Sequence, residues 1–308
     1  MPAPFVLAID VEPGPRYQLS GAPAEWDGFQ RCVAHLEPWR KTVLQRTGQP
    51  LVVTWFMRCD DQIAAYGHDA WALDYFKPSI EALRAQGDAF GLHVHPYEHL
   101  DEGSWRQNVS DETELLRVIE AGVRNFEQRL GPVRYYRCGD NFQSNAAVAL
   151  LDALGVEYDL TMEPGRASKP FPEPDLGTTT DYRRAPRVPY RPAHDDFLRP
   201  DAETGRRLWM VPLTMGCFDH PHELHPSSSG HRIEMMHVGF DSQFFQPFVD
   251  HAMSCGKPVV AVTRTGDVDW SPWLFANFDY LLGHEQVANV QFVSPADLVQ
   301  RTTLTTTD

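Results

Sequence analysis

The sequence predicts an α/β fold in which a mostly parallel sheet or barrel of strands is surrounded by helices. Short apolar or β-branched runs alternate with segments whose apolar residues recur every three or four positions. The first pattern is typical of buried strands, and the second is typical of amphipathic helices. Such alternation favours parallel strands joined by helical crossovers, and ligands of these folds bind at the carboxyl ends of the strands.

The first half of the chain supplies most of the expected strands and helices. The expected strands, in order, are residues 5–9, 51–56, 90–95, 133–136 and 156–160. The expected helices between and after them are residues 26–45, 79–85, 110–130 and 144–154. Ser110 is the expected N-cap of the third helix, because two acidic residues follow it and favour the helix dipole. Gly131 and Pro132 end that helix.

A proline-rich segment interrupts the alternation in the second half of the chain. Eight prolines lie between residues 164 and 200, too many for regular structure, so we expect an irregular excursion at about 163–206. The later expected elements are strands at residues 208–212, 233–238, 258–262 and 290–293 and a helix at 244–253. Residues 1–308 are therefore predicted to form one catalytic barrel domain with a proline-rich insertion.

Composition narrows the class of protein. The chain is 42% apolar and 22% charged, which is ordinary for a globular protein, and its net charge of -15 disfavours nucleic acid as a partner. No secretion signal and no membrane span is visible in the sequence. The five cysteines are scattered and lack any Cys-x-x-Cys pair, a pattern that fits reduced thiols. We therefore expect a cytoplasmic protein.

Polar residues with complementary chemistry follow several of the expected strands. Asp10 and Glu12 follow the first strand, and three histidines, His93, His95 and His99, lie at the end of the third strand or just after it. Arg137 and Asp140 follow the fourth strand, and His237 lies in a late apolar run. Carboxylate, imidazole and guanidinium groups at one edge of a sheet indicate a metal-dependent hydrolase.

The histidine cluster allows two metal-binding pairs. Residues two apart on a strand point to the same face, so His93 and His95 are able to hold one ion together. His95 and His99 are four apart and would be neighbours on a helix. We favour His93 with His95, because Pro96 opposes a helical turn, and His99 stays an alternative.

The order of these motifs resembles the polysaccharide deacetylase superfamily, also described as NodB homology or carbohydrate esterase family 4, whose fold is a distorted (β/α) barrel. The shared motifs are an acidic pair after the first strand, a Thr-x-Phe strand, a Gly-x-His run, a strand followed by arginine, and a late hydrophobic-His motif. In this chain they are residues 8–12, 54–56, 91–99, 136–155 and 235–237. The resemblance covers roughly residues 4–262.

The resemblance implies a role for each matching residue. Asp10 would be the general base, Glu12 with His93 and His95 would bind one divalent metal ion, with zinc as the expected ion, and Arg137 would orient Asp10. His237 would protonate the leaving amine. The resemblance also implies a small-molecule or glycan substrate as the partner.

The chain departs from the family because Val11 separates two acids that are usually adjacent aspartates and Glu12 replaces one of them. The family's two histidines are usually four apart, and its Arg-x-Pro-Tyr motif is residues 137–140 here, with the sequence Arg-Cys-Gly-Asp.

Other polar residues are candidates for binding the substrate. Arg58 and Asp60 follow the second expected strand, and with Asp140 they are expected to bind substrate. A second histidine cluster, residues 220–225, lies in a Pro/Ser-rich loop, where we expect contact with substrate instead of a second metal.

The predicted function is metal-dependent removal of an N-acyl group, in particular acetyl, from a sugar or sugar precursor. A catalytically altered NodB-like protein that only binds carbohydrate is the main alternative, because the acidic motif differs. An amidohydrolase-type metal hydrolase is a further alternative, but that family places its His-x-His pair at the first strand, about ninety residues before the pair in this chain.

Overall fold

The computed structural model describes residues 2–100, 104–170, 176–219 and 231–304, and most of its strands lie in one curled parallel sheet. The sheet has eight strands in the order β11-β1-β2-β3-β6-β7-β8, and β12 also pairs with β1. Its strands are β1 Ala3–Val11, β2 Val53–Arg58, β3 Ala89–Val94, β6 Tyr135–Cys138, β7 Tyr158–Asp159, β8 Trp209–Met210, β11 Val259–Arg264 and β12 Val290–Phe292. All of their pairings are parallel.

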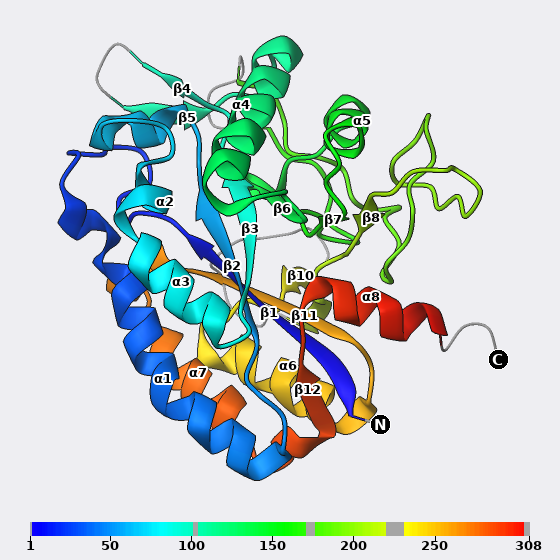
Figure 1. Cartoon of the computed structure of the whole chain (residues 1–308). Coiled ribbons are helices and arrows are strands. Elements are labelled where there is room, and N and C mark those ends of the chain that lie inside the picture. The colour runs from blue at the N-terminus through cyan, green and yellow to red at the C-terminus, as the bar shows by residue number, and fades with distance from the viewer. Residues whose placement is uncertain (1, 101–103, 171–175, 220–230, 305–308) are drawn as a thin grey trace.

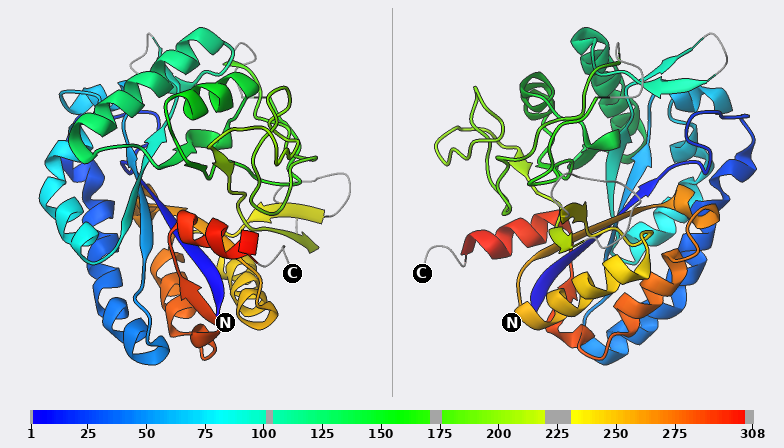
Figure 2. Two further views of the ribbon diagram at one scale, coloured as in Figure 1. Left: turned by 45° about the vertical axis from the view of Figure 1, so that its right-hand side comes forward. Right: turned by 180° about the vertical axis from the view of Figure 1, so that it is seen from behind.

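Helices cover the outside of this sheet, as the alternating pattern predicted (Figures 1 and 2). They are α1 Asp27–Thr47, α2 Trp71–Tyr75, α3 Lys77–Ala85, α4 Glu112–Leu130, α5 Asn145–Ala153, α6 Ser242–Cys255, α7 Leu274–Gly283 and α8 Pro295–Leu304. Alternate residues of β1 pack into two apolar clusters: Leu7 and Ile9 join the larger cluster, and Val6 and Ala8 join the smaller one. Burial on both faces explains the continuous apolar run of this strand.

Two short antiparallel hairpins and the late part of the chain complete the barrel. Strands β4 Tyr97–His99 and β5 Trp105–Gln107 form one hairpin, and β9 Met215–Asp219 and β10 His231–Met235 form the other. Near the second hairpin, Thr214 N–H donates to the carbonyl oxygen of Val260, and His237 forms a parallel bridge with Val262. These contacts connect the segment after β8 to β11 and place His237 at the carboxyl-end edge of the sheet.

The expected strands and helices are present with boundaries shifted by a few residues, but one cap differs. The N-cap of α4 is Asp111, not Ser110: the Asp111 side chain accepts a hydrogen bond from Glu114 N–H. Ser110 instead contacts Asn108, which accepts from both its N–H and its hydroxyl. A carboxylate competes well for this position because it also interacts favourably with the helix dipole.

The proline-rich segment packs against the barrel through side chains. Its described residues form turns and isolated bridges, such as Pro192 with Pro200. Tyr182, Tyr190 and Phe197 are buried in the larger apolar cluster. The Tyr190 hydroxyl donates to the carbonyl oxygen of Phe197, so its polar end is satisfied within the segment.

Asp88, just before β3, is expected to be important for stability. Its buried carboxylate accepts hydrogen bonds from Arg40, from Val53 N–H at 3.0 Å and from Trp55 Nε1 at 2.7 Å. Asp88→Ala would leave these donors without their acceptor and should lower the free energy of unfolding by about 3 kcal/mol. Urea unfolding measures this effect. As a control, Glu120→Ala breaks an exposed ion pair with Arg124 and should cost less than about 0.5 kcal/mol.

Candidate active site

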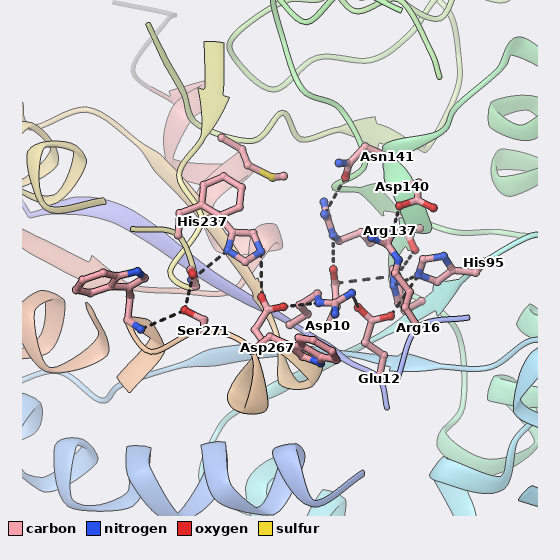
Figure 3. Close-up of a pocket in the computed structure, with 18 of the residues that line it drawn as sticks. Asp10, Glu12, Arg16, His95, Arg137, Asp140, Asn141, His237, Asp267 and Ser271 are labelled. Atoms are coloured by element: carbon pink, nitrogen blue, oxygen red, sulfur yellow. Dashed lines mark hydrogen bonds and ion pairs between the residues drawn. The ribbon is translucent and has the colours of Figure 1, made fainter. Parts of the chain in front are cut away.

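A cavity of about 590 Å³ lies at the carboxyl ends of the strands (Figure 3). The predicted site residues that line it are Asp10, Glu12, His93, His95, Arg137, Asp140 and His237. They come from the ends of β1, β3 and β6, from the residues just after these strands, and from the segment after β10, which are far apart in sequence. The structure therefore brings together seven of the ten individual residues that the sequence singled out, and the other three, Arg58, Asp60 and His99, do not line the cavity.

Glu12, His93 and His95 form a compact group of potential metal ligands. Their ligand atoms all lie within 4.8 Å of one another. His95 Nε2 lies 3.1 Å from His93 Nε2 and 3.4 Å from Glu12 Oε2. His99 is exposed on β4, where its ring packs against Trp105. The structure thus places His93 and His95, and not His99, beside the acidic residue.

The Nδ1 atoms of His93 and His95 each face an oxygen acceptor, and this determines which ring nitrogen carries the proton. His93 Nδ1 lies 2.9 Å from the carbonyl oxygen of Arg137, so this nitrogen carries the proton. Gln107 donates from Nε2 to the carbonyl oxygen of Gly139, which leaves its Oε1 facing His95 Nδ1 at 3.0 Å. His95 Nδ1 is therefore also the protonated nitrogen. In the neutral rings, both Nε2 lone pairs point at the same space, as in histidines that bind a metal.

The carboxylates near this group outnumber the arginines by one, which leaves one negative charge for a cation. Four arginines near the site each have a carboxylate partner other than Glu12, in the pairs Arg16–Asp140, Arg58–Asp60, Arg137–Asp10 and Arg264–Asp267. Arg264 and Arg58 also approach Glu12, at 3.2 and 3.5 Å. Although burial alone would raise the pKa of Glu12, Arg264 and His95 hold it well below its usual range. Glu12 is therefore ionised, and the donor set of one carboxylate and two imidazoles fits a divalent ion.

Asp10 has one carboxylate oxygen that lacks a hydrogen-bond partner among the described residues. Its Oδ2 accepts a hydrogen bond from Arg137 Nε at 2.9 Å. Its Oδ1 is buried, has no hydrogen-bond partner among the described residues and lies 4.0 Å from His93 Nδ1. Arg137 is held in turn by the carbonyl oxygen of Leu160 and by Asn141 Oδ1. This arrangement fixes the carboxylate and leaves one oxygen to accept a proton.

The turn after β6 requires a glycine and two residues in the left-handed region. A Cβ on Gly139 would lie 2.1 Å from His95 Nδ1, so only glycine fits beside this ring. Asp140 and Asn141 have φ angles of 48° and 52°, which residues other than glycine seldom adopt. This backbone lets Asp140 pair with Arg16 while Asn141 contacts Arg137. Strain of this kind is typical of functional sites.

His237 faces a carboxylate that the sequence analysis did not single out. Gly239 N–H donates to His237 Nδ1 at 3.0 Å, so the neutral ring carries its proton on Nε2, which lies 3.6 Å from Asp267 Oδ2. The ring stacks on Phe240. Burial lowers the pKa of His237 below its ordinary value, although Asp267 opposes this effect.

Arg264 and Asp267 belong to the site although the sequence prediction did not include them. Arg264 is the last residue of β11, and Asp267 follows it in a short 3-10 helix. Both line the cavity. Their position directly at the carboxyl end of an expected strand is the sequence signal for them, because ligands of parallel sheets bind at these ends.

Arg58 and Asp60 lie outside the cavity lining, beneath the ligand group. Their side chains are 1% and 0% exposed. Arg58 contacts Asp60 and Gln62 and approaches Glu12, and Asp60 Oδ2 accepts from His95 N–H at 2.9 Å. These contacts hold Glu12 and His95 in place and give neither residue direct access to substrate. The histidine cluster at residues 220–225 lies outside the described residues.

The low pKa of His237 predicts how stability depends on pH. In the unfolded chain this imidazole binds a proton near pH 6.5, whereas the folded protein keeps it neutral to lower pH. The unfolded state then binds one more proton at this side chain, so the contribution of His237 to the free energy of unfolding should fall by up to about 1.4 kcal/mol per pH unit below about pH 6.5. Urea unfolding from pH 7.5 to 5.5 measures the slope in the presence of a chelator. His237→Gln should flatten the slope, and an unchanged slope would contradict the assignment.

Comparisons with known proteins identify the fold. No protein-family model matches the chain, and no curated protein is significantly similar to it. A solved structure assigned as a polysaccharide deacetylase from Mycobacterium smegmatis is similar over 98% of this chain and 91% of its own, with a TM-score of 0.52 and 14% identity. A Pseudomonas aeruginosa structure with the same assignment is similar over 96% of this chain and 89% of its own, with a TM-score of 0.53 and 12% identity. The structure of the Puue allantoinase is similar over 98% of this chain and 90% of its own, with a TM-score of 0.55 and 13% identity.

The chain has the fold of the NodB-type polysaccharide deacetylases, a distorted (β/α) barrel, as the resemblance in its motifs predicted. The structural similarity shows the fold alone, because the identities are only 12 to 14%, and the reaction has to be argued from the site. None of the described helices is both long and apolar enough to cross a membrane.

Proposed function

We propose that this protein is a metal-dependent hydrolase that removes an N-acyl group, in particular acetyl, from an amino sugar or its precursor. The main support is the orientation of His93 and His95. Their Nδ1 atoms both donate hydrogen bonds, and the lone pairs of their Nε2 atoms face one another at 3.1 Å beside Glu12. Two facing lone pairs repel unless a cation lies between them. A zinc ion bound by these three residues would satisfy all three ligands.

The chain's own residues would complete the reaction. When bound, the metal ion supplies Lewis-acid activation of water and of the acyl oxygen. Asp10 Oδ1 accepts the proton of the attacking water, and Arg137 holds that carboxylate in its orientation. His237 Nε2–H is the donor group for the leaving nitrogen. Full proton transfer from it requires the imidazolium form, which Asp267 favours and burial opposes.

Metal removal and acetate release test this proposal together. Treating the purified protein with a chelator should abolish acetate release from N-acetylated amino sugars, and added zinc should restore it. His93→Ala should lose both metal and activity, whereas His99→Ala, a control on the exposed histidine, should keep both. Full activity at a metal content near zero would refute the proposal.

The same experiment separates the alternatives. A NodB-like protein that only binds carbohydrate would bind the sugars without releasing acetate. Because one similar structure is an allantoinase, allantoin should be tested beside the sugars. If the protein hydrolysed allantoin and released no acetate, the proposed metal site would stand and the proposed substrate would be wrong.

A further inference from the structure

We propose that Tyr182, in the proline-rich segment, is a positioning residue for the reaction and acts through Asn141 on Arg137. This inference rests on the proposed function and gives the proline-rich segment a part in it. The Tyr182 side chain is 1% exposed and does not line the catalytic cavity. Its effect on the reaction is therefore indirect.

Three hydrogen bonds connect Tyr182 to the proposed base. The Tyr182 hydroxyl donates to the carbonyl oxygen of Asn141 at 2.7 Å. Asn141 Oδ1 accepts from Arg137 at 2.8 Å, and Arg137 Nε donates to Asp10 Oδ2 at 2.9 Å (Figure 3). Burial raises the pKa of the Tyr182 hydroxyl well above its usual value, so this group keeps its proton and stays a donor.

The backbone of Asn141 is the part of this connection that needs an external restraint. Its φ angle of 52° lies in the left-handed region, directly after Asp140 with a φ angle of 48°. For residues other than glycine this region is unfavourable, and it persists only where the surroundings hold the backbone in place. The hydrogen bond from Tyr182 holds the carbonyl group of Asn141. Without this bond the peptide is free to rotate, and the Asn141 side chain would move away from Arg137.

The proline-rich segment holds Tyr182 in turn. Gly165 N–H donates to the carbonyl oxygen of Tyr182 at 2.8 Å, and Tyr182 N–H donates to the carbonyl oxygen of Arg166 at 2.8 Å. Two residues earlier, Thr180 Oγ1 accepts from Gln143 N–H at 2.8 Å and donates to the Gln143 carbonyl oxygen at 2.7 Å. The segment is thus attached to the chain just after the turn that Tyr182 holds.

A second tyrosine of the same segment provides a matched control. Tyr190 is also buried, and its hydroxyl donates to the carbonyl oxygen of Phe197 at 2.6 Å. Phe197 belongs to the segment itself, and neither residue lines the catalytic cavity. Loss of either hydroxyl removes a donor from a backbone carbonyl group, but only the carbonyl group held by Tyr182 belongs to a residue that contacts Arg137.

The first test is the kinetics of acetate release, with the stability of each variant measured by urea unfolding. Because a misplacement of about 1 Å costs roughly 100-fold in rate, we expect Tyr182→Phe to lower kcat about tenfold and to change KM less than about twofold. Tyr190→Phe should lower the free energy of unfolding by a similar amount and leave kcat unchanged. Replacement of Tyr182 by para-aminophenylalanine, whose amino group donates a similar bond, should restore kcat.

A double-mutant cycle tests whether Tyr182 acts through Asn141. Asn141→Gly keeps the left-handed backbone, because glycine adopts it freely, and removes the Oδ1 atom that holds Arg137. This variant should lower kcat at least about tenfold, and in its background Tyr182→Phe should change kcat less than about twofold. If the two effects multiply, or if Asn141→Gly keeps full kcat, the inference is wrong.

An NMR measurement separates this inference from the proposed function. The signal of the Arg137 Nε–H group, assigned by its loss in Arg137→Lys, should shift in Tyr182→Phe and stay in place in Tyr190→Phe. That result in a protein that releases no acetate would support the positioning of Arg137 by Tyr182 and refute the proposed function. An unchanged signal in Tyr182→Phe, equal losses of kcat in the two variants, or a raised KM at unchanged kcat would each overturn the inference.

Discussion

Asp10→Asn should lower kcat for acetate release about 10³-fold without removing the metal. The substitution keeps the size of the side chain, and its amide oxygen still accepts a hydrogen bond from Arg137. However, an amide accepts no proton from water, and general base catalysis contributes roughly 10²- to 10⁴-fold to rates. Steady-state kinetics and metal analysis of the same preparation measure the two effects separately.

A control on a distant carboxylate makes the result specific. Asp181→Asn alters an exposed ion pair with Arg183 and should leave kcat and metal content unchanged. If Asp10→Asn lost the metal, Asp10 would be a ligand and the role of Glu12 would have to be revised. If it kept full kcat, the base would have to be another group.

Gly139→Ala should weaken metal binding about 100-fold while leaving the three proposed ligands in the sequence. The added Cβ would lie 2.1 Å from His95 Nδ1, so the ring would have to move and lose its contact with Gln107. Loss of an interaction that orients a ligand typically costs 10- to 100-fold in metal affinity. Competition with a fluorescent zinc chelator measures the dissociation constant.

Gly14→Ala provides a matched control in the same region. A Cβ there would lie 3.6 Å from its nearest neighbour, an ordinary contact, and the backbone is not in the left-handed region. Zinc affinity should be unchanged in this variant. Equal affinity of the Gly139→Ala protein and the unmodified protein would mean that the orientation of His95 is not needed for metal binding.

The sequence predicted the strands and the residues at their ends for a physical reason. A central strand of a covered sheet is buried on both faces, and this gives a continuous apolar run that ends where polar side chains begin, as at Ile9 and Asp10. The alternation of a strand brings His93 and His95 to one face without any long-range information. These features depend only on residues that are close together in the chain, so they can be predicted from a single sequence.

The features that were not predicted depend on contacts between distant segments. In the sequence, Arg58 is a charged residue at a strand end, where exposure is expected. In the structure its guanidinium is buried and donates hydrogen bonds to Asp60 and Gln62. The strands of the β4–β5 hairpin are only three residues long, too short for a periodic signal. The contact of Asp267 with His237 depends on the parallel bridge between His237 and Val262. Only the folded chain creates these neighbours.

The position of β1 in the sheet determines when the site comes into existence during synthesis. This strand lies between β2 and β11, so Glu12 meets Arg58 from one side and Arg264 from the other, and 206 positions separate these two arginines in the sequence (264 minus 58). A ribosome that has released only the first two thirds of the chain presents β1 with an unpaired edge and an incomplete ligand environment. Unpaired edges invite aggregation, and contacts over such distances form slowly. Glu12, the acidic member of the proposed ligand group, therefore reaches its final environment only once β11 has paired with β1.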